Sequence, residues 1–187
     1  MEYINTYNEL KNIFTLDKEI IPIEGSKMSI RILKFTSNSS LILPPKGVDE
    51  DTEMQKSIAM ADGSIPENNT FSYPVFVPDS ATLHSKAIIL LHGLNERSWL
   101  KYLPWAYRLA SETNRPIILF PISFHMNRSP DNWANPREMM PLLSQRSKIE
   151  GLSMSTFANI ALSQRLSDYP LRFFASGKQS ADDITKL

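Results

Sequence analysis

Two short apolar runs constrain the fold of this chain most: KAIILL at Lys86–Leu91 and PIILF at Pro116–Phe120. Runs that are apolar on both faces of a strand are typical of the middle of a mainly parallel sheet. Residues 98–113, between the runs, have the periodicity of a helix, and Pro104 falls where a first helical turn tolerates it. The pattern therefore predicts a strand–helix–strand unit with a right-handed crossover.

Other segments predict elements around this unit. Period-two alternation predicts two strands or a hairpin in 18–35, and Pro74 in SYPVFVP (72–78) favours an edge strand. Residues 36–70 are rich in serine, proline, asparagine and acid, which predicts a long polar loop with a short helical turn near 53–60. Helices are expected at 1–16, 137–145 and 155–166, with breaks at Pro170 and Gly177 and a new helix start at Ser180.

The composition excludes several classes of function. The 187 residues include 20 Lys and Arg against 20 Asp and Glu, so no net field attracts nucleic acid or an anionic membrane. The chain has no cysteine, and its three histidines do not form a metal-ligand pair at helical spacing. It has no phosphate-binding glycine motif, signal peptide or apolar run of membrane-spanning length. We expect a soluble, cytoplasmic protein without cofactor, metal, nucleic-acid or membrane partner.

The strongest motif for chemistry is Leu90-Leu91-His92-Gly93-Leu94-Asn95, directly after the first buried run. A strand that leads into His-Gly, a loop and a helix resembles the oxyanion-hole loop of the α/β-hydrolase family. The resemblance covers about Tyr73 to Pro130 and implies that the Leu94 N–H is an oxyanion donor, with His92 shaping the loop. Glycine at 93 would let the backbone turn sharply, so valine there should distort the loop. The chain also resembles uncharacterised bacterial α/β-hydrolase-like proteins.

The chain departs from that family in the catalytic residues. It has no Gly-x-Ser-x-Gly elbow, and Ser176-Gly177, the nearest match, lacks the preceding glycine and any later histidine. Ser180 and Asp183 form a capping box four residues before Leu187. We therefore expect a single truncated domain over 1–187, with the nucleophile, acid and histidine beyond Leu187, and an inactive isolated chain. The expected fold is α/β: a partial α/β-hydrolase-like sheet, mainly parallel in its centre, with flanking helices.

A second group of polar residues follows the second apolar run, and ligands of open α/β sheets bind at the carboxyl ends of the strands. Arg128 or Arg137 could hold a carboxylate or phosphate; alternatively, each arginine pairs with a nearby acid such as Asp131 or Glu138. Asn95 and Arg97 could instead serve the helix that follows them. The expected rim of the site is Asn95, Arg97, His125 and Arg128.

Two functions remain open. One is the N-terminal portion of a serine hydrolase acting on a small-molecule ester or amide, with the oxyanion loop but without the triad. The other is a non-catalytic binding or structural protein that has the same scaffold. An incomplete sheet would leave an apolar edge that aggregates or pairs.

Overall fold

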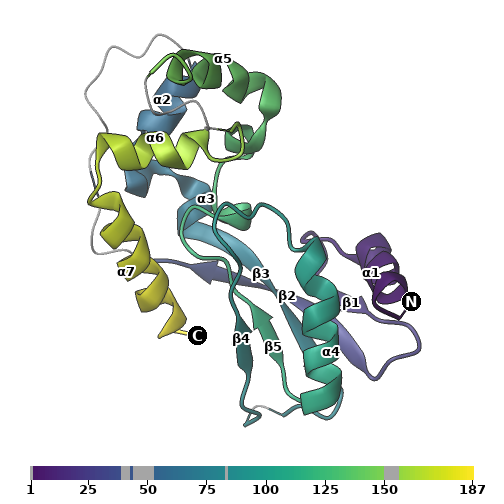
Figure 1. Ribbon diagram of the computed structural model, residues 1–187. Coiled ribbons are helices and arrows are strands. Elements are labelled where there is room, and N and C mark those ends of the chain that lie inside the picture. The colour runs from purple at the N-terminus through teal and green to yellow at the C-terminus, as the bar shows by residue number, and fades with distance from the viewer. Residues whose placement is uncertain (1, 39–42, 44–52, 83, 150–155) are drawn as a thin grey trace. The chain divides into compact units, whose positions relative to one another are not determined.

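The computed structural model describes residues 2–38, 43, 53–82, 84–149 and 156–187 (Figure 1). The remaining parts of the predicted loop, 39–42 and 44–52, and the predicted helix start at Ser155 lie outside these residues. The chain divides into two compact units. Unit 1 comprises Met1–Phe35 and Phe71–Pro121, and unit 2 comprises Thr36–Thr70 and Ile122–Leu187.

Unit 1 is built on a mixed sheet whose described strands follow the order β1-β2-β3-β5-β4 (Figure 1). The strands are β1 (Ile20–Pro22), β2 (Met28–Thr36), β3 (Thr70–Pro78), β4 (Ile88–Leu90) and β5 (Ile117–Leu119). The predicted hairpin is confirmed, because β1 and β2 pair antiparallel with Ile21 opposite Ile30. The alternation of buried and more exposed residues along β2 produces one apolar face.

The prediction of a mainly parallel sheet is wrong. β4 and β5 form a parallel pair, whereas β3 runs antiparallel to β5. The KAIILL strand β4 lies at the end of the strand order, with Ile89 and Leu91 partly exposed, and not in the middle of the sheet. Continuous apolar sequence is typical of a strand that is buried on both faces, but here Ile89 stays partly exposed. The run itself does not record how many strands flank it.

β3 also differs from expectation. Pro74 favours an edge strand, but β3 lies between β2 and β5. The described pairing of β3 with β5 involves Val75 and Phe76, so the proline falls just outside it. A proline that has no amide hydrogen can therefore occupy an internal strand where the ladder on that side has ended.

Helices in unit 1 pack against the sheet and one another. A 3₁₀ turn (Leu100–Tyr102) leads into α4 (Leu103–Thr113), with Pro104 in its first turn as predicted. α4 packs against β5, and α1 (Glu2–Ile13) packs against α4 (Figure 1). Aromatic rings at Phe35, Phe71, Tyr73 and Phe120 fill the core, with the Phe120 centroid about 5.4–5.5 Å from the other three.

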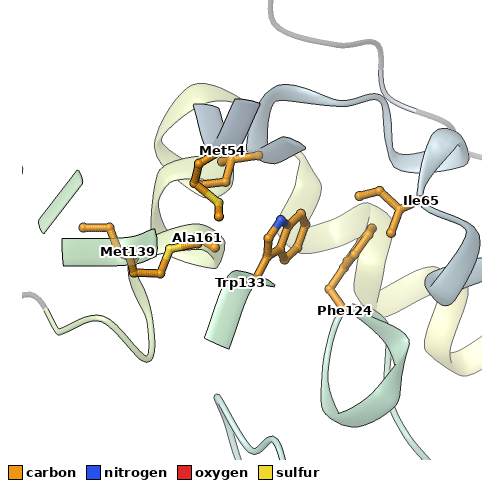
Figure 2. Close-up of a cluster of buried hydrophobic side chains, with 8 residues drawn as sticks. Met54, Ile65, Phe124, Trp133, Met139 and Ala161 are labelled. Carbon is orange, nitrogen blue, oxygen red and sulfur yellow. The ribbon is translucent and has the colours of Figure 1, made fainter. Parts of the chain in front are cut away.

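Unit 2 is helical. Its α-helices are α2 (Glu53–Ala59), α3 (Pro66–Asn69), α5 (Pro136–Arg146), α6 (Ile160–Asp168) and α7 (Arg172–Ile184). Three 3₁₀ turns join them, at Asp62–Ser64, Met126–Arg128 and Asp131–Ala134. The helices expected near 53–60 and 137–145 are confirmed, and the one expected at 155–166 starts later, at Ile160. Met54, Ile65, Phe124, Met139 and Ala161 surround the buried indole of Trp133 (Figure 2).

The predicted helix start at Ser180 is wrong. α7 begins at Arg172 and passes through Gly177 and Ser180 without a break. The Ser180 hydroxyl bonds back to the carbonyl of Ser176 at 2.8 Å, and Asp183 faces a buried arginine instead of closing a capping box. The capping signal that supported a truncated domain is therefore absent. Among the helices described, none combines the length and apolar character that a membrane crossing needs.

Candidate functional site

The His-Gly loop follows the carboxyl end of β4 and leads into the 3₁₀ turn before α4, as the sequence predicts. His92 is buried at its base. Its Nδ1 lies 2.9 Å from the Gly93 carbonyl oxygen, and its ring meets Trp99 edge-on at 5.7 Å. Because a carbonyl only accepts, this bond makes Nδ1 the protonated nitrogen. This bond ties the His92 ring to the backbone of the loop.

The two amides after His92 have different surroundings. The Gly93 N–H donates to the Tyr102 hydroxyl at 2.9 Å. The Leu94 N–H has no acceptor among the residues that the structure describes, and its side chain is 79% exposed. The amide assigned by resemblance to an incoming oxyanion is thus the one not used by the fold.

Gly93 is not the residue that turns the backbone sharply. Its φ is not left-handed, and a Cβ built there would meet its nearest neighbour, Glu96 Oε1, at 3.6 Å, an ordinary contact. The left-handed residue of the loop is Asn95, with φ of 59°. The expectation that Gly93 provides the turn is therefore wrong, because a short polar side chain two residues later provides it.

This assignment predicts the effects of substitutions at Asn95. Asn95→Val should lower the free energy of unfolding by about 1–2 kcal/mol, because a β-branched side chain is strained in left-handed backbone. Asn95→Gly should be close to neutral. Urea denaturation of both variants measures the difference, with Gly93→Ala as a control that should change stability little. If Gly93→Ala lowered the free energy of unfolding more than Asn95→Val, Gly93 and not Asn95 would determine the turn.

The other predicted rim residue of this loop, Arg97, is half-buried. Burial lowers the pKa of the Arg97 guanidinium. Next to it, Glu96 forms an ion pair with Lys101, in the 3₁₀ turn that begins the helical segment. Asn95 and Arg97 thus lie on the loop itself, and Glu96 connects it to the following turn.

His125 and Arg128 belong to unit 2, whereas the His-Gly loop belongs to unit 1. Arg128 is wholly buried, and its Nη2 lies 2.9 Å from the Asp183 carboxylate. Burial lowers the pKa of Arg128 to about 10, and the Asp183 charge opposes that shift. The placement of Arg128 on an exposed rim is wrong. Arg128 instead forms an ion pair, which was the alternative interpretation, but its partner is Asp183 and not a nearby acid such as Asp131.

His125 is also buried, with Nδ1 2.8 Å from the Ser123 carbonyl oxygen. This bond links two residues of the same loop, the one that follows β5. Arg137, the other predicted anion-binding arginine, is exposed near the start of α5, where its backbone N–H donates to the Asn135 cap. His125 is thus buried in its own loop, whereas the Arg137 side chain is exposed.

A buried polar network in unit 2 has no counterpart in the sequence predictions. Ser37 Oγ donates to Asp183 at 2.8 Å and accepts from Gln179 Nε2 at 2.8 Å. Gln179 Oε1 accepts from Asn68 at 2.9 Å and from Ser123 at 3.1 Å. The network joins α7 to segments more than 50 residues earlier in the chain. Its side chains outside α7 come from polar segments that the sequence predicts to be solvent-exposed loops.

A second buried ionic cluster lies between α6, α7 and the turn at Asp62–Ser64. Asp62 pairs with both Arg165 and Arg172. Burial and, to a smaller extent, the Arg172 charge lower the pKa of Arg165 to about 10, although Asp62 opposes both effects. The Arg165 guanidinium also lies 5.2 Å from the ring centroids of Phe124 and Trp133. Through Asp62, these two arginines connect α6 and α7 to the turn at Asp62–Ser64.

A shallow hollow of about 200 Å³ lies between α1 and α4 in unit 1. Its charged lining residues, Arg108 and Glu112, pair with each other at 2.7 Å. The hollow therefore offers aromatic and hydroxyl contacts from Tyr3, Thr6, Tyr107 and Ser111, with its charges already matched.

Ser176, the nearest match to a nucleophile motif, does not lie on a strand-to-helix elbow. It sits inside α7, with its hydroxyl on the Phe173 carbonyl. Groups of His, Asp and Glu that could hold a metal ion are also absent from the described residues. Among the described residues, the His-Gly loop presents the Leu94 N–H, which the fold does not use.

Comparison with known proteins gives a family but no activity. A family model described as a family of unknown function (DUF6051) matches residues 1–187. No curated protein and no solved structure matches the chain.

Proposed function

The chain belongs to the DUF6051 family, and we propose that it supplies the oxyanion-binding part of an α/β-hydrolase-like enzyme that cleaves esters or amides. The observation that supports the proposal best is the unused Leu94 N–H at the carboxyl end of a strand in the parallel β4–β5 pair. Backbone amides held in this way stabilise the oxyanion that forms as an acyl carbonyl is attacked.

The surroundings of the loop fit this role. A donor contributes most to catalysis when its position is fixed before the substrate arrives. Here the Tyr102 hydroxyl fixes the preceding amide, and the bond between the His92 ring and the Gly93 carbonyl fixes the peptide unit that carries the Leu94 nitrogen. The donor is therefore preorganised by its own neighbours.

The proposal sets a geometric requirement for the nucleophile. The outer edge of β4 is not paired in the described sheet, and neighbouring strands lie about 4.8 Å apart. A strand that pairs parallel with β4 would bring its carboxyl end beside the Leu94 amide, whereas an antiparallel strand would bring its amino end. The nucleophile would thus have to follow a parallel strand that is not among the described residues.

The test is to remove the amide hydrogen of residue 94. Leu94→Pro deletes the donor, and we expect kcat toward an activated ester such as p-nitrophenyl acetate to fall about 10²–10³-fold in the gene product that contains these residues. Leu94→Ala keeps the N–H and is the matched control, with kcat close to that of the parent. Equal rates for the two variants, both folded by circular dichroism, would remove the loop from the mechanism.

A second prediction concerns the 187-residue chain alone. It should not turn over the same ester, because its sequence has no Gly-x-Ser-x-Gly nucleophile elbow. The measurement is ester hydrolysis after purification, compared between the parent and Ser176→Ala. Turnover that disappears with Ser176→Ala would place the nucleophile in α7 and overturn the assignment. An inert gene product would instead favour the non-catalytic binding or structural alternative.

A further inference from the structure

Helix α7 turns polar side chains toward the interior of unit 2 and its aromatic side chains toward solvent. Its buried residues share one helical face, and they are Arg172, Ala175, Gln179, Ser180 and Asp183. Ala175 is the one apolar member of that set. In contrast, Phe173 and Phe174 are 66% and 68% exposed. A surface helix normally buries its apolar face, so the polarity of α7 is reversed.

The hydrophobic core of unit 2 forms without α7. The buried cluster around Trp133 takes its side chains from α2, α5, α6 and the connecting segments that carry Ile65, Phe124 and Trp133 itself (Figure 2). None of the described members of this cluster belongs to α7, and neither do the partly buried residues packed against it. Because burial of apolar surface is the dominant favourable contribution to folding, the core does not depend on α7 for that contribution.

Polar contacts hold α7 in place instead. Asp183 pairs with Arg128 at 2.9 Å, and Arg172 pairs with Asp62 at 2.9 Å. The Gln179 side chain adds hydrogen bonds of 2.8–3.1 Å to other segments of unit 2. When such groups separate, water solvates both partners, so the net free energy that each contact contributes to docking is small.

We propose that α7 is a separately opening helix, which undocks from unit 2 while the core around Trp133 stays folded. Opening exposes Arg128, Asp62 and the other polar groups beneath α7 to water. Unit 2 therefore has a closed and an open form that share one hydrophobic core. This inference is independent of the hydrolase proposal, because the His-Gly loop belongs to unit 1.

Native-state hydrogen exchange of the 187-residue chain tests the opening directly. Relative to their intrinsic rates, the most protected amides of α7 should exchange about tenfold or more faster than the most protected amides of α5 and α6. The reason is that α7 amides exchange through undocking, whereas the core helices exchange through unfolding of the unit. Equal protection in the three helices would overturn the proposal.

A substitution in the core separates undocking from unfolding of the unit. Ile160→Val shortens a buried side chain of the Trp133 cluster. The change destabilises the closed and the open form equally, so exchange in α5 and α6 should rise about two- to tenfold while exchange in α7 stays unchanged. An equal rise in α7 would show that α7 opens only when the whole unit unfolds, and would overturn the proposal.

A substitution in α7 gives the opposite pattern. Asp183→Asn leaves Arg128 buried without its counter-charge only while α7 is docked, so α7 should lose about a hundredfold or more of its protection while α5 and α6 remain protected. The matched control is Asp182→Asn, which removes an exposed charge from the same helix and should change protection less than about fivefold. Equal effects of the two variants, or a core that unfolds together with α7 in Asp183→Asn, would contradict a separately opening helix.

Discussion

Asp183→Asn should lower the free energy of unfolding by about 3–5 kcal/mol, the range typical of breaking a buried ion pair from one side. The substitution leaves the Arg128 guanidinium without its counter-charge at a wholly buried position. It also removes one of the carboxylate oxygens that accept from Ser37. Urea denaturation followed by circular dichroism measures the change.

The neighbouring residue provides a matched control. Asp182 pairs with Lys178 on the exposed side of the same helix, α7, at 2.6 Å. Asp182→Asn removes the same charge from the same helix, yet it should cost less than about 1 kcal/mol, because both partners remain in water. Similar losses for the two variants would show that the buried pair contributes no more than a surface pair.

Trp133→Ala should cost about 3–5 kcal/mol, the usual loss for truncating a fully buried large aromatic residue. The indole is wholly buried among the side chains of unit 2, where it stacks near Phe124 and donates its Nε1–H to the Ser57 hydroxyl at 3.1 Å. Its removal leaves a cavity and takes away one of the two rings that lie beside the Arg165 guanidinium. The shift in the urea midpoint measures the loss.

Trp105→Ala is the control for this substitution. Trp105 is 51% exposed and lies on α4 in unit 1, against the Tyr102 ring. Its truncation should cost much less, since little cavity forms at a half-exposed position. A loss equal to that of Trp133→Ala would mean that aromatic contacts, and not burial, set the stability of this protein.

The sequence predicts the local structure of this chain better than its long-range arrangement. Hydrophobic periodicity identifies α1, the β1–β2 hairpin and the strand–helix–strand unit, because each depends on residues close in sequence. The position of β4 at the edge depends on which strands flank it, which no pattern within KAIILL records. β3 is internal despite Pro74 for the same reason.

Ser180 shows how a local signal fails. Serine followed three residues later by an acid is the pattern of a helix start, but here both side chains face a buried interior in the middle of α7. The Ser180 hydroxyl accepts a hydrogen bond from the backbone N–H of Ser123 at 3.0 Å, and Asp183 forms an ion pair with Arg128. Contacts with residues far away in the sequence therefore use the two side chains that the local pattern assigns to helix capping.

In the candidate site, too, the sequence predicts local features better than long-range ones. The place of the His92-Gly93-Leu94 loop after a strand is predicted correctly, because strand, turn and helix are consecutive. The buried state of Arg128 is not predicted, because its partner lies 55 residues away in the chain. Ser37 and Asn68 sit in polar segments that resemble solvated loop, and only the fold shows that they are buried.

The distribution of tryptophan between the units gives each unit its own optical reporter. Trp99 and Trp105 lie in unit 1, and Trp133 is the tryptophan of unit 2. Trp133→Phe would leave fluorescence from unit 1 alone, and the double replacement of Trp99 and Trp105 would leave unit 2 alone. Emission spectra recorded during denaturation would then show whether the two units lose their structure in one transition or in two.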